Sequence, residues 1–144
     1  MKKLSKWLSG YSMSHQNLFN KKIHKVTAPG IFVALVGLIW SIPTLEIMQF
    51  SFNWLWLFAG GVLVFYYKLS IMVFIMMLGF ILASSALIWS ISILQVSTFH
   101  LSLSFLALFW LVQLIGYKIE GVMPSFKQRL EFVLIGPIWA FYKQ

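Results

Sequence analysis

The sequence predicts an all-α integral membrane protein. Hydrophobic residues make up 60% of the 144 residues, charged residues only 10%, and the mean hydropathy is +0.88. A water-soluble globular domain carries about a quarter charged residues, so most of this surface must face lipid. We expect a single membrane domain over residues 1–144, with about four transmembrane helices and a shorter interfacial helix near each end.

Four apolar blocks supply the predicted spans, because about 20 helical residues cross the hydrocarbon core of a bilayer. The blocks cover residues 29–45, 51–67, 71–94 and 98–117. A further apolar stretch, 130–142, is shorter and contains Gly136-Pro137, which favours an interfacial or re-entrant helix. A fifth crossing remains open, since it would move only Lys143 to the other side.

The N-terminal segment predicts an amphipathic helix over residues 4–18. Its apolar residues recur at steps of three and four, with lysines on the other faces. Such a helix lies in the plane of the membrane interface. His15 falls on the apolar stripe, so we expect its side chain to point away from water.

The basic residues predict the orientation of the chain. With four crossings, every Lys and Arg falls on one side of the membrane, which the positive-inside rule makes cytoplasmic, together with both termini. The net charge of +8 then indicates contact with anionic lipid headgroups and not with nucleic acid. A transporter is disfavoured because the spans hold almost no ionisable residues at mid-depth. The absence of cysteine excludes disulfides, thiolate catalysis and cysteine-ligated metals.

Two histidines stand close together before the first apolar block. His15 and His24 are nine residues apart, so a continuous helix would place them on opposite faces, at about 100° per residue. They can meet only if the chain turns between them. Asn17 and Asn20 are suitable turn and cap residues. With Asn20 as the N-cap of the next helix, the two imidazoles would face each other across a helical corner.

A second polar group ends the last predicted span. Gln113, Tyr117 and Glu120 share one helix face at i, i+4 and i+7. A polar stripe in a membrane helix is costly unless it meets polar partners, and Gly116 would allow another backbone to come close. This end lies on the predicted cytoplasmic side, as the two histidines do. We therefore expect both groups to form one site.

A set of two histidines and one carboxylate suits non-haem Fe(II), with coordination positions left open for oxygen and substrate. The predicted ligands are His15, His24 and Glu120. Neighbouring amides can orient such ligands from outside the coordination sphere; the candidates are Asn17, Asn20 and Gln113. In the alternative interpretation, the histidines merely hydrogen-bond helix ends and Glu120 pairs with a basic residue. Spacing alone leaves both open.

The third histidine stands apart from this group. His100 falls in the loop without basic residues, on the opposite side of the predicted membrane. A shared metal ion would require it to cross about 30 Å of hydrocarbon. We expect His100 to be an interfacial residue.

The same residues carry a resemblance to a known family. The chain is similar to the small membrane proteins related to the fungal 2-hydroxy fatty acid dioxygenase, an enzyme of fatty-acid α-oxidation. The similarity covers roughly residues 11–141. The residues that carry it are Tyr11, His15, Asn17, Asn20, His24, Pro29, Gln113, Gly116, Glu120, Gly121, Pro124 and Ile135-Gly136-Pro137.

Membership implies an Fe(II)-dependent dioxygenase that does not use 2-oxoglutarate. It would take a long-chain 2-hydroxy fatty acid and O₂ from the surrounding membrane lipids and release the acid one carbon shorter and CO₂. By the same resemblance, His15 and His24 are the iron ligands and Asn17 and Asn20 support them. Either a bacterial inner membrane or the endoplasmic reticulum would suit such a protein.

One position departs from the family pattern, which usually has Gly-His where this chain has Gly116-Tyr117. If that histidine is a ligand, Tyr117 replaces a neutral nitrogen with a phenol whose pKa is about 10, and tyrosinate suits ferric haem iron in catalase. Tyr117 is thus a candidate catalytic residue. The departure also predicts an alternative function, a non-catalytic lipid-binding or scaffold protein of the same fold.

Overall fold

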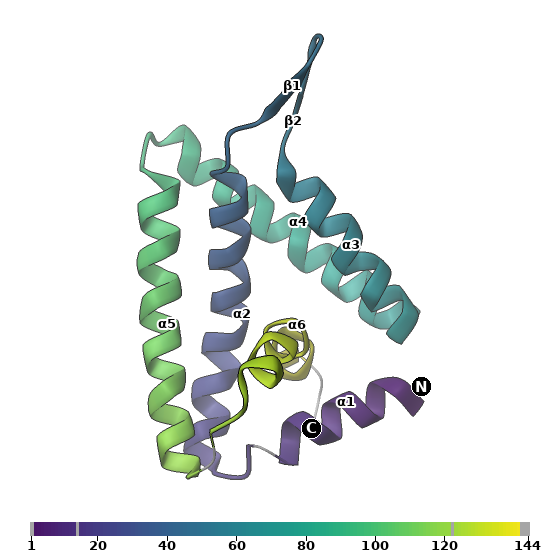
Figure 1. Cartoon of the computed structure of the whole chain (residues 1–144), viewed down its shortest axis with the longest axis vertical. Helices are drawn as coiled ribbons and strands as arrows, with labels where there is room; N and C mark the ends of the chain where they lie inside the picture. Colours follow the sequence, from purple (N-terminus) through teal and green to yellow (C-terminus); the bar gives the residue numbers. More distant parts are fainter. Residues whose placement is uncertain (1, 14, 122, 142–144) are drawn as a thin grey trace. The chain divides into compact units, whose positions relative to one another are not determined.

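The computed structural model describes residues 2–13, 15–121 and 123–141. Within them the chain forms six helices and one β-hairpin (Figure 1). The elements are α1 (Lys2–Met13), α2 (Leu18–Trp40), β1 (Leu45–Ile47), β2 (Phe50–Phe52), α3 (Trp54–Leu69), α4 (Ile71–Ile93), α5 (Thr98–Glu120) and α6 (Phe126–Phe141). Tyr142 and Lys143, which bear on the last apolar stretch and on a fifth crossing, lie outside the described residues.

Three of the described helices are long and apolar enough to cross a membrane, namely α2, α4 and α5. Each has 23 residues, which corresponds to about 35 Å of helix and exceeds the hydrocarbon thickness of about 30 Å. α3 is also apolar but has only 16 residues. The predominantly helical prediction is confirmed, and the candidate spans fit a membrane protein.

The first span was predicted over residues 29–45, but its helix begins at Leu18 and ends at Trp40. The early start has a local cause. The side-chain oxygen of Asn17 accepts hydrogen bonds from the backbone N–H groups of Phe19 (2.8 Å) and Asn20 (3.4 Å), as an N-cap residue does. The prediction that Asn20 caps this helix is therefore wrong, and the lysine-rich segment belongs to the same helix as the apolar one.

The predicted loop between the first two spans, together with the adjoining ends of those spans, forms the hairpin β1–β2. Leu45 pairs with Phe52 and Glu46 with Ser51, and Met48 occupies the turn with a φ of 56°. Asn53 anchors the base of this hairpin, because its side chain accepts from the N–H of Leu55 (2.9 Å) and donates to the carbonyl of Trp40 (3.1 Å). Apolar composition alone does not distinguish such a hairpin from the end of a helix.

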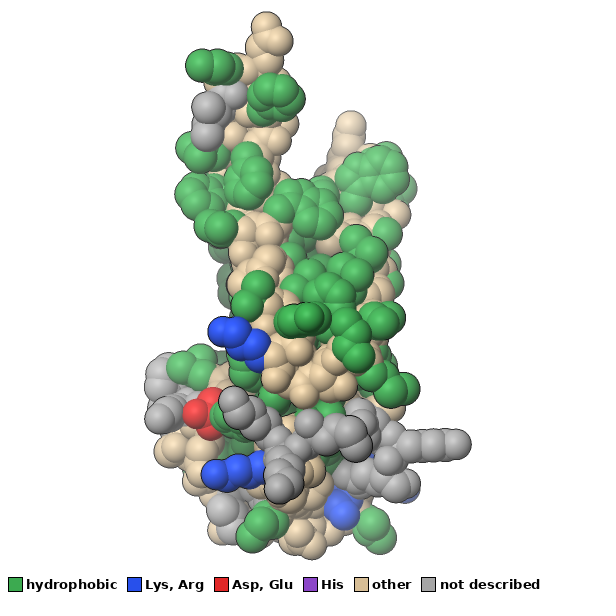
Figure 2. All heavy atoms as spheres, turned by 90° about the vertical axis from the view of Figure 1, so that its right-hand side faces the viewer, with side chains coloured by type: hydrophobic (Ala, Val, Ile, Leu, Met, Phe, Trp, Pro, Cys, Tyr) green, Lys and Arg blue, Asp and Glu red, His purple; other side chains and the backbone are tan. Residues whose placement is uncertain are grey.

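The chain divides into two compact units. We call residues 33–104 the hairpin unit, and the described residues before and after them the histidine unit. In the hairpin unit, α3 and α4 pack against each other around a turn at Ser70, whose side chain accepts from the N–H of Met72 (3.3 Å). Large hydrophobic side chains remain exposed on both helices. Figure 2 shows such side chains over much of the face in view, as expected for a surface that meets lipid.

In the histidine unit, α1 packs against α6 beside the first half of α2 and the second half of α5 (Figure 1). Two glycines permit close approach to α2. A Cβ at Gly136 of α6 would lie 2.7 Å from the Cβ of Ala28, and a Cβ at Gly30 would lie 2.5 Å from the ring of Phe109 on α5. Four helices can therefore surround one small region.

The two predicted interfacial helices are both present, with shifted bounds. α1 ends at Met13 and not at residue 18, and α6 begins at Phe126 and not at residue 130. His15 consequently lies after α1 and not on its apolar stripe. Its backbone N–H donates to the carbonyl of Ser12 (3.1 Å), a short-range bond typical of a helix C-terminus. The interfacial location of α1 and α6 stays a prediction.

Candidate functional site

The histidine unit brings His15 and His24 together. Their ring centroids are 4.2 Å apart with an interplanar angle of 70°, and both side chains are fully buried. The chain turns between the end of α1 and the start of α2, so His24, about two turns into α2, faces the residue that follows α1. Two imidazoles that a continuous helix would separate therefore meet in one buried place.

Backbone carbonyls fix the orientation of both rings. His15 Nδ1 lies 2.8 Å from the carbonyl oxygen of Tyr11, and His24 Nδ1 lies 3.1 Å from that of Asn20. A carbonyl can only accept, so Nδ1 carries the proton and Nε2 holds a lone pair in each neutral ring. His24 Nε2 is buried without a hydrogen-bond partner. Burial also lowers the pKa of His15 below its usual value of 6.5, which keeps the ring neutral.

This arrangement is the one that metal-binding histidines use. A ligating imidazole presents one nitrogen to the ion and donates the other N–H to a carbonyl or carboxylate, which fixes the tautomer and the ring direction. The same geometry could serve a hydrogen-bond donor on a substrate.

Aromatic rings enclose the pair. Tyr11 stacks on His15 with centroids 4.2 Å apart and an interplanar angle of 3°, and Tyr117 lies 4.9 Å from His24. Trp139 of α6 lies 6.0 Å from His15, and its Nε1 donates to the hydroxyl of Ser12 (3.0 Å). Tyr11 and Trp139 are buried, and burial raises the pKa of the Tyr11 phenol. The walls of the site are therefore buried aromatic rings.

Glu120 lies beside this cluster but binds the start of α2. One carboxylate oxygen accepts from the backbone N–H of Gln16 (2.6 Å), and the other accepts from the N–H of Asn17 (3.0 Å) and from Asn20 Nδ2 (2.8 Å). An anion is stabilised at a helix N-terminus by unpaired N–H groups and by the helix dipole. The described residues contain no group of three His, Cys, Asp or Glu side chains placed to hold a metal ion.

The ligand set of two histidines and Glu120 stays a prediction. The two histidines meet, and the carboxylate is engaged by the backbone of α2. A different oxygen is available beside them. Asn20 Oδ1 is buried without a hydrogen-bond partner, and an unsatisfied buried polar group costs about 1–3 kcal/mol.

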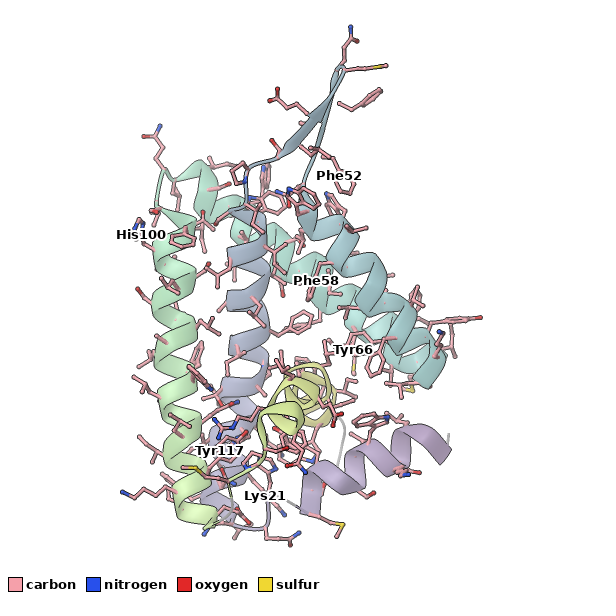
Figure 3. All side chains as sticks on the ribbon, in the orientation of Figure 1. Lys21, Phe52, Phe58, Tyr66, His100 and Tyr117 are labelled. Carbon is pink, nitrogen blue, oxygen red and sulfur yellow. The ribbon has the colours of Figure 1, made fainter. Side chains whose placement is uncertain are left out.

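Gly116 makes this arrangement possible. A Cβ at Gly116 would collide with Asn20 Oδ1 and would lie 3.1 Å from Cε1 of His24. The absence of a side chain lets α5 approach α2 at the level of the histidine, as the sequence predicts for this glycine. The next residue, Tyr117, can then place its ring beside His24, between α5 and α2 (Figure 3).

The other predicted residues have different places. Gln113 is half-buried one turn before Tyr117 and stands outside the hydrogen-bonded cluster of described residues. Asn17 is the N-cap of α2. His100 is exposed in the first turn of α5 (Figure 3), where its Nδ1 lies 2.6 Å from the hydroxyl of Ser97.

Two aromatic residues that contact His15 were not identified from the sequence. Trp139 and Phe132 of α6 contact His15, with ring centroids 6.0 and 5.8 Å away. The sequence offers Lys21, Lys22, Lys25 and Lys118 alike as groups that could attract a substrate carboxylate; of these, Lys21 is half-buried and interacts electrostatically with His15. A weak signal for α6 was present in Gly136-Pro137, because a glycine within an apolar helix often marks close packing.

Comparison with protein families adds one finding. A family model described as 2-hydroxy-palmitic acid dioxygenase Mpo1-like matches residues 1–143. The chain belongs to this family. The resemblance inferred from the sequence is therefore confirmed, and the family description supports a 2-hydroxy fatty acid dioxygenase-like protein. No curated protein and no solved structure matched the chain.

Proposed function

We propose that this protein is a membrane-bound oxygenase that converts a long-chain 2-hydroxy fatty acid into the acid one carbon shorter. The reaction balances as hydroxy acid plus O₂ giving shortened acid, CO₂ and water. The C1–C2 bond breaks, and the substrate gives up the four electrons that O₂ takes up, so no separate reductant is needed. The observation that carries the proposal is the buried histidine pair with both Nδ1–H groups fixed, in a chain of this family.

The donor atoms fit ferrous iron. Neutral imidazole nitrogens suit iron(II), and a site with few protein ligands leaves positions for other molecules. His15 and His24 would hold the ion through Nε2, since their other nitrogens donate to backbone carbonyls. Ferrous iron, when bound, supplies the one-electron chemistry that lets ground-state O₂ react with a closed-shell substrate.

The remaining residues bind and shield the substrate. Tyr11, Tyr117 and Trp139 surround the histidines with buried rings, which keeps water from reactive species. The ammonium group of Lys21, which acts electrostatically on His15, would attract the carboxylate of the hydroxy acid. The exposed lysines Lys22 and Lys25 are better suited to lipid headgroups. The acyl chain would lie along the apolar helices.

A non-catalytic, lipid-binding protein is the second candidate. It is favoured by two observations, namely that no three-residue His, Cys, Asp or Glu cluster occurs among the described residues, and that Tyr117 replaces the histidine expected from the resemblance. The two candidates differ in whether the protein binds iron.

The experiment uses the full chain purified in lipid nanodiscs and loaded anaerobically with ferrous iron. We expect about one bound iron per chain, oxygen uptake with 2-hydroxypalmitate, and pentadecanoic acid as the product by mass spectrometry. His24→Ala should abolish iron binding and turnover, whereas the matched His100→Ala variant should retain both. If the wild-type chain binds no iron, or if His24→Ala turns over normally, the proposed oxygenase is wrong.

A further inference from the structure

We infer that Asn20 supplies a side-chain oxygen as the third donor to the ion held by the histidine pair, and that Glu120 is the positioning residue for that oxygen. The inference deepens the proposed function and rests on it. It exchanges the roles that the sequence suggests, in which the carboxylate is the ligand and the amide supports it.

The hydrogen bonds of Asn20 determine which way its amide points. Its Nδ2 donates to a carboxylate oxygen of Glu120 at 2.8 Å. The opposite assignment of the amide would set an oxygen lone pair against a carboxylate oxygen, which is repulsive. The amide oxygen must therefore point away from Glu120. Asn20 is fully buried, and this oxygen has no hydrogen-bond partner.

The amide of Asn20 lies on the same face of α2 as His24. Asn20 is one turn before His24, and its backbone carbonyl accepts from His24 Nδ1 at 3.1 Å. Asn20 Oδ1 and His24 Cε1, the ring atom between the two nitrogens, both lie against Gly116. One residue thus fixes the tautomer of His24 with its carbonyl and places a second acceptor near Cε1, the ring atom bonded to Nε2.

Glu120 is poorly suited to be the donor itself. Its two oxygens already accept from the N–H groups of Gln16 and Asn17 and from Asn20 Nδ2. Binding an ion would compete with charge-assisted bonds that stabilise the start of α2. Its geometry instead holds the Asn20 amide in one orientation, as groups outside the coordination sphere commonly do for ligands.

A neutral third donor has a chemical consequence. Two imidazoles and an amide leave the full charge of a divalent cation uncompensated by the protein. The site would then attract an anionic ligand that adds oxygen donors, and a 2-hydroxy carboxylate offers both a carboxylate and a hydroxyl oxygen. With a carboxylate ligand from the protein, that attraction would be weaker.

The test compares ferrous iron and cobalt(II) binding to the full chain in nanodiscs, by anaerobic equilibrium dialysis with metal analysis and by the visible spectrum of the cobalt form. Asn20→Leu keeps the side-chain size but removes the oxygen, so we expect affinity to fall at least about 10-fold and the cobalt spectrum to change. Asn53→Ala is the matched control. It removes the asparagine N-cap of α3 in the hairpin unit, so it should lower the melting temperature while leaving affinity and spectrum unchanged.

A double variant exchanges the amide and the carboxylate between positions 20 and 120. When Asn20→Asp is combined with Glu120→Gln, the introduced glutamine amide can donate to one oxygen of the introduced aspartate, whose other oxygen then faces the histidines with a negative charge. We expect this variant to bind cobalt(II) at least as tightly as the wild type. Asn20→Asp alone places two carboxylates side by side, so it should bind differently and fold less stably.

The outcomes separate the two proposals. If the wild type binds iron through His24 but Asn20→Leu binds iron and cobalt(II) with unchanged affinity and spectrum, the Asn20 donor is overturned and the oxygenase stands. If the double variant binds no more tightly than Asn20→Leu, the positioning role of Glu120 is overturned. If the wild type binds neither metal, the proposed oxygenase fails and this inference fails with it.

Discussion

The two units of the chain bury polar side chains in different ways. In the hairpin unit, the buried hydroxyls of Ser84 and Ser85 donate to the carbonyls one turn earlier on α4, at 2.7 Å each. Each is satisfied within its own helix. In the histidine unit, buried His15 follows α1 whereas buried Asn20 and His24 lie on α2, and His24 Nε2 and Asn20 Oδ1 have no hydrogen-bond partner.

This difference helps to distinguish buried polar groups that serve only the fold from buried polar groups that are available to bind a ligand. A serine that bonds its own helix needs nothing else, and it lets two helices pack closely. Buried acceptors without a donor lower the stability of the protein alone. They are compatible with a stable fold when a ligand, ion or water completes them. The histidine unit is therefore where we expect binding to stabilise the chain.

The largest expected effect comes from filling the space at Gly116. Gly116→Val places a branched side chain against Asn20 Oδ1 and His24, so α5 must move away from α2. Overpacking of this kind costs about 1–3 kcal/mol, and we expect iron binding to be lost. The matched control is Gly79→Val on α4, where a Cβ would meet nothing within 4 Å. Iron content and melting temperature are measured for both variants. If the two variants showed equal iron content and equal melting temperature, the proposed difference between the two units would be wrong.

The meeting of the histidines could be predicted because it depends on short-range geometry. Nine residues on a helix give opposite faces, so proximity required a turn, and the asparagines indicated where it lies. The cap of α2 was misplaced by three residues because both Asn17 and Asn20 are suitable locally. The choice depends on Glu120, about one hundred residues away, which binds Asn20 and occupies its amide.

The features that sequence reasoning missed also depend on structure that local sequence patterns do not determine. Trp139 and Phe132 reach His15 through the packing of α6 on α1, and apolar periodicity does not determine which helix a face meets. The hairpin was not predicted because residues 46–50 were interpreted only as a loop between two spans. Leu45 and Phe52, which pair in the hairpin, are as apolar as lipid-facing residues and were assigned to the spans. The turn of the hairpin depends on the positive φ of Met48, a conformation that methionine rarely adopts.

A substitution at Tyr117 is expected to have an effect of intermediate size on iron binding. Tyr117→His would place a third imidazole beside His24, where the phenol ring now lies 4.9 Å away. If this position is a replaced ligand, we expect iron affinity to rise about 10-fold, within the range that supporting changes produce at metal sites, and oxygen uptake to increase. Tyr117→Phe is the control for size and should leave affinity unchanged. An equal result for both variants would show that the tyrosine serves as a wall and not as a substituted ligand.

The smallest expected effect lies in the hairpin unit. Ser85→Ala removes a hydroxyl whose only described partner is the carbonyl of Ile81 on the same helix. That carbonyl retains its α-helical N–H donor, and alanine has the higher helix propensity. We therefore expect the melting temperature and iron content to stay close to the wild-type values, with a change in stability of no more than about 0.5 kcal/mol. Asn20→Ala removes a buried polar group from the histidine unit and should lower iron content strongly. A loss of iron in Ser85→Ala would mean that buried polarity in α4 also supports binding, because a hydroxyl satisfied by its own helix has no other physical route to the site.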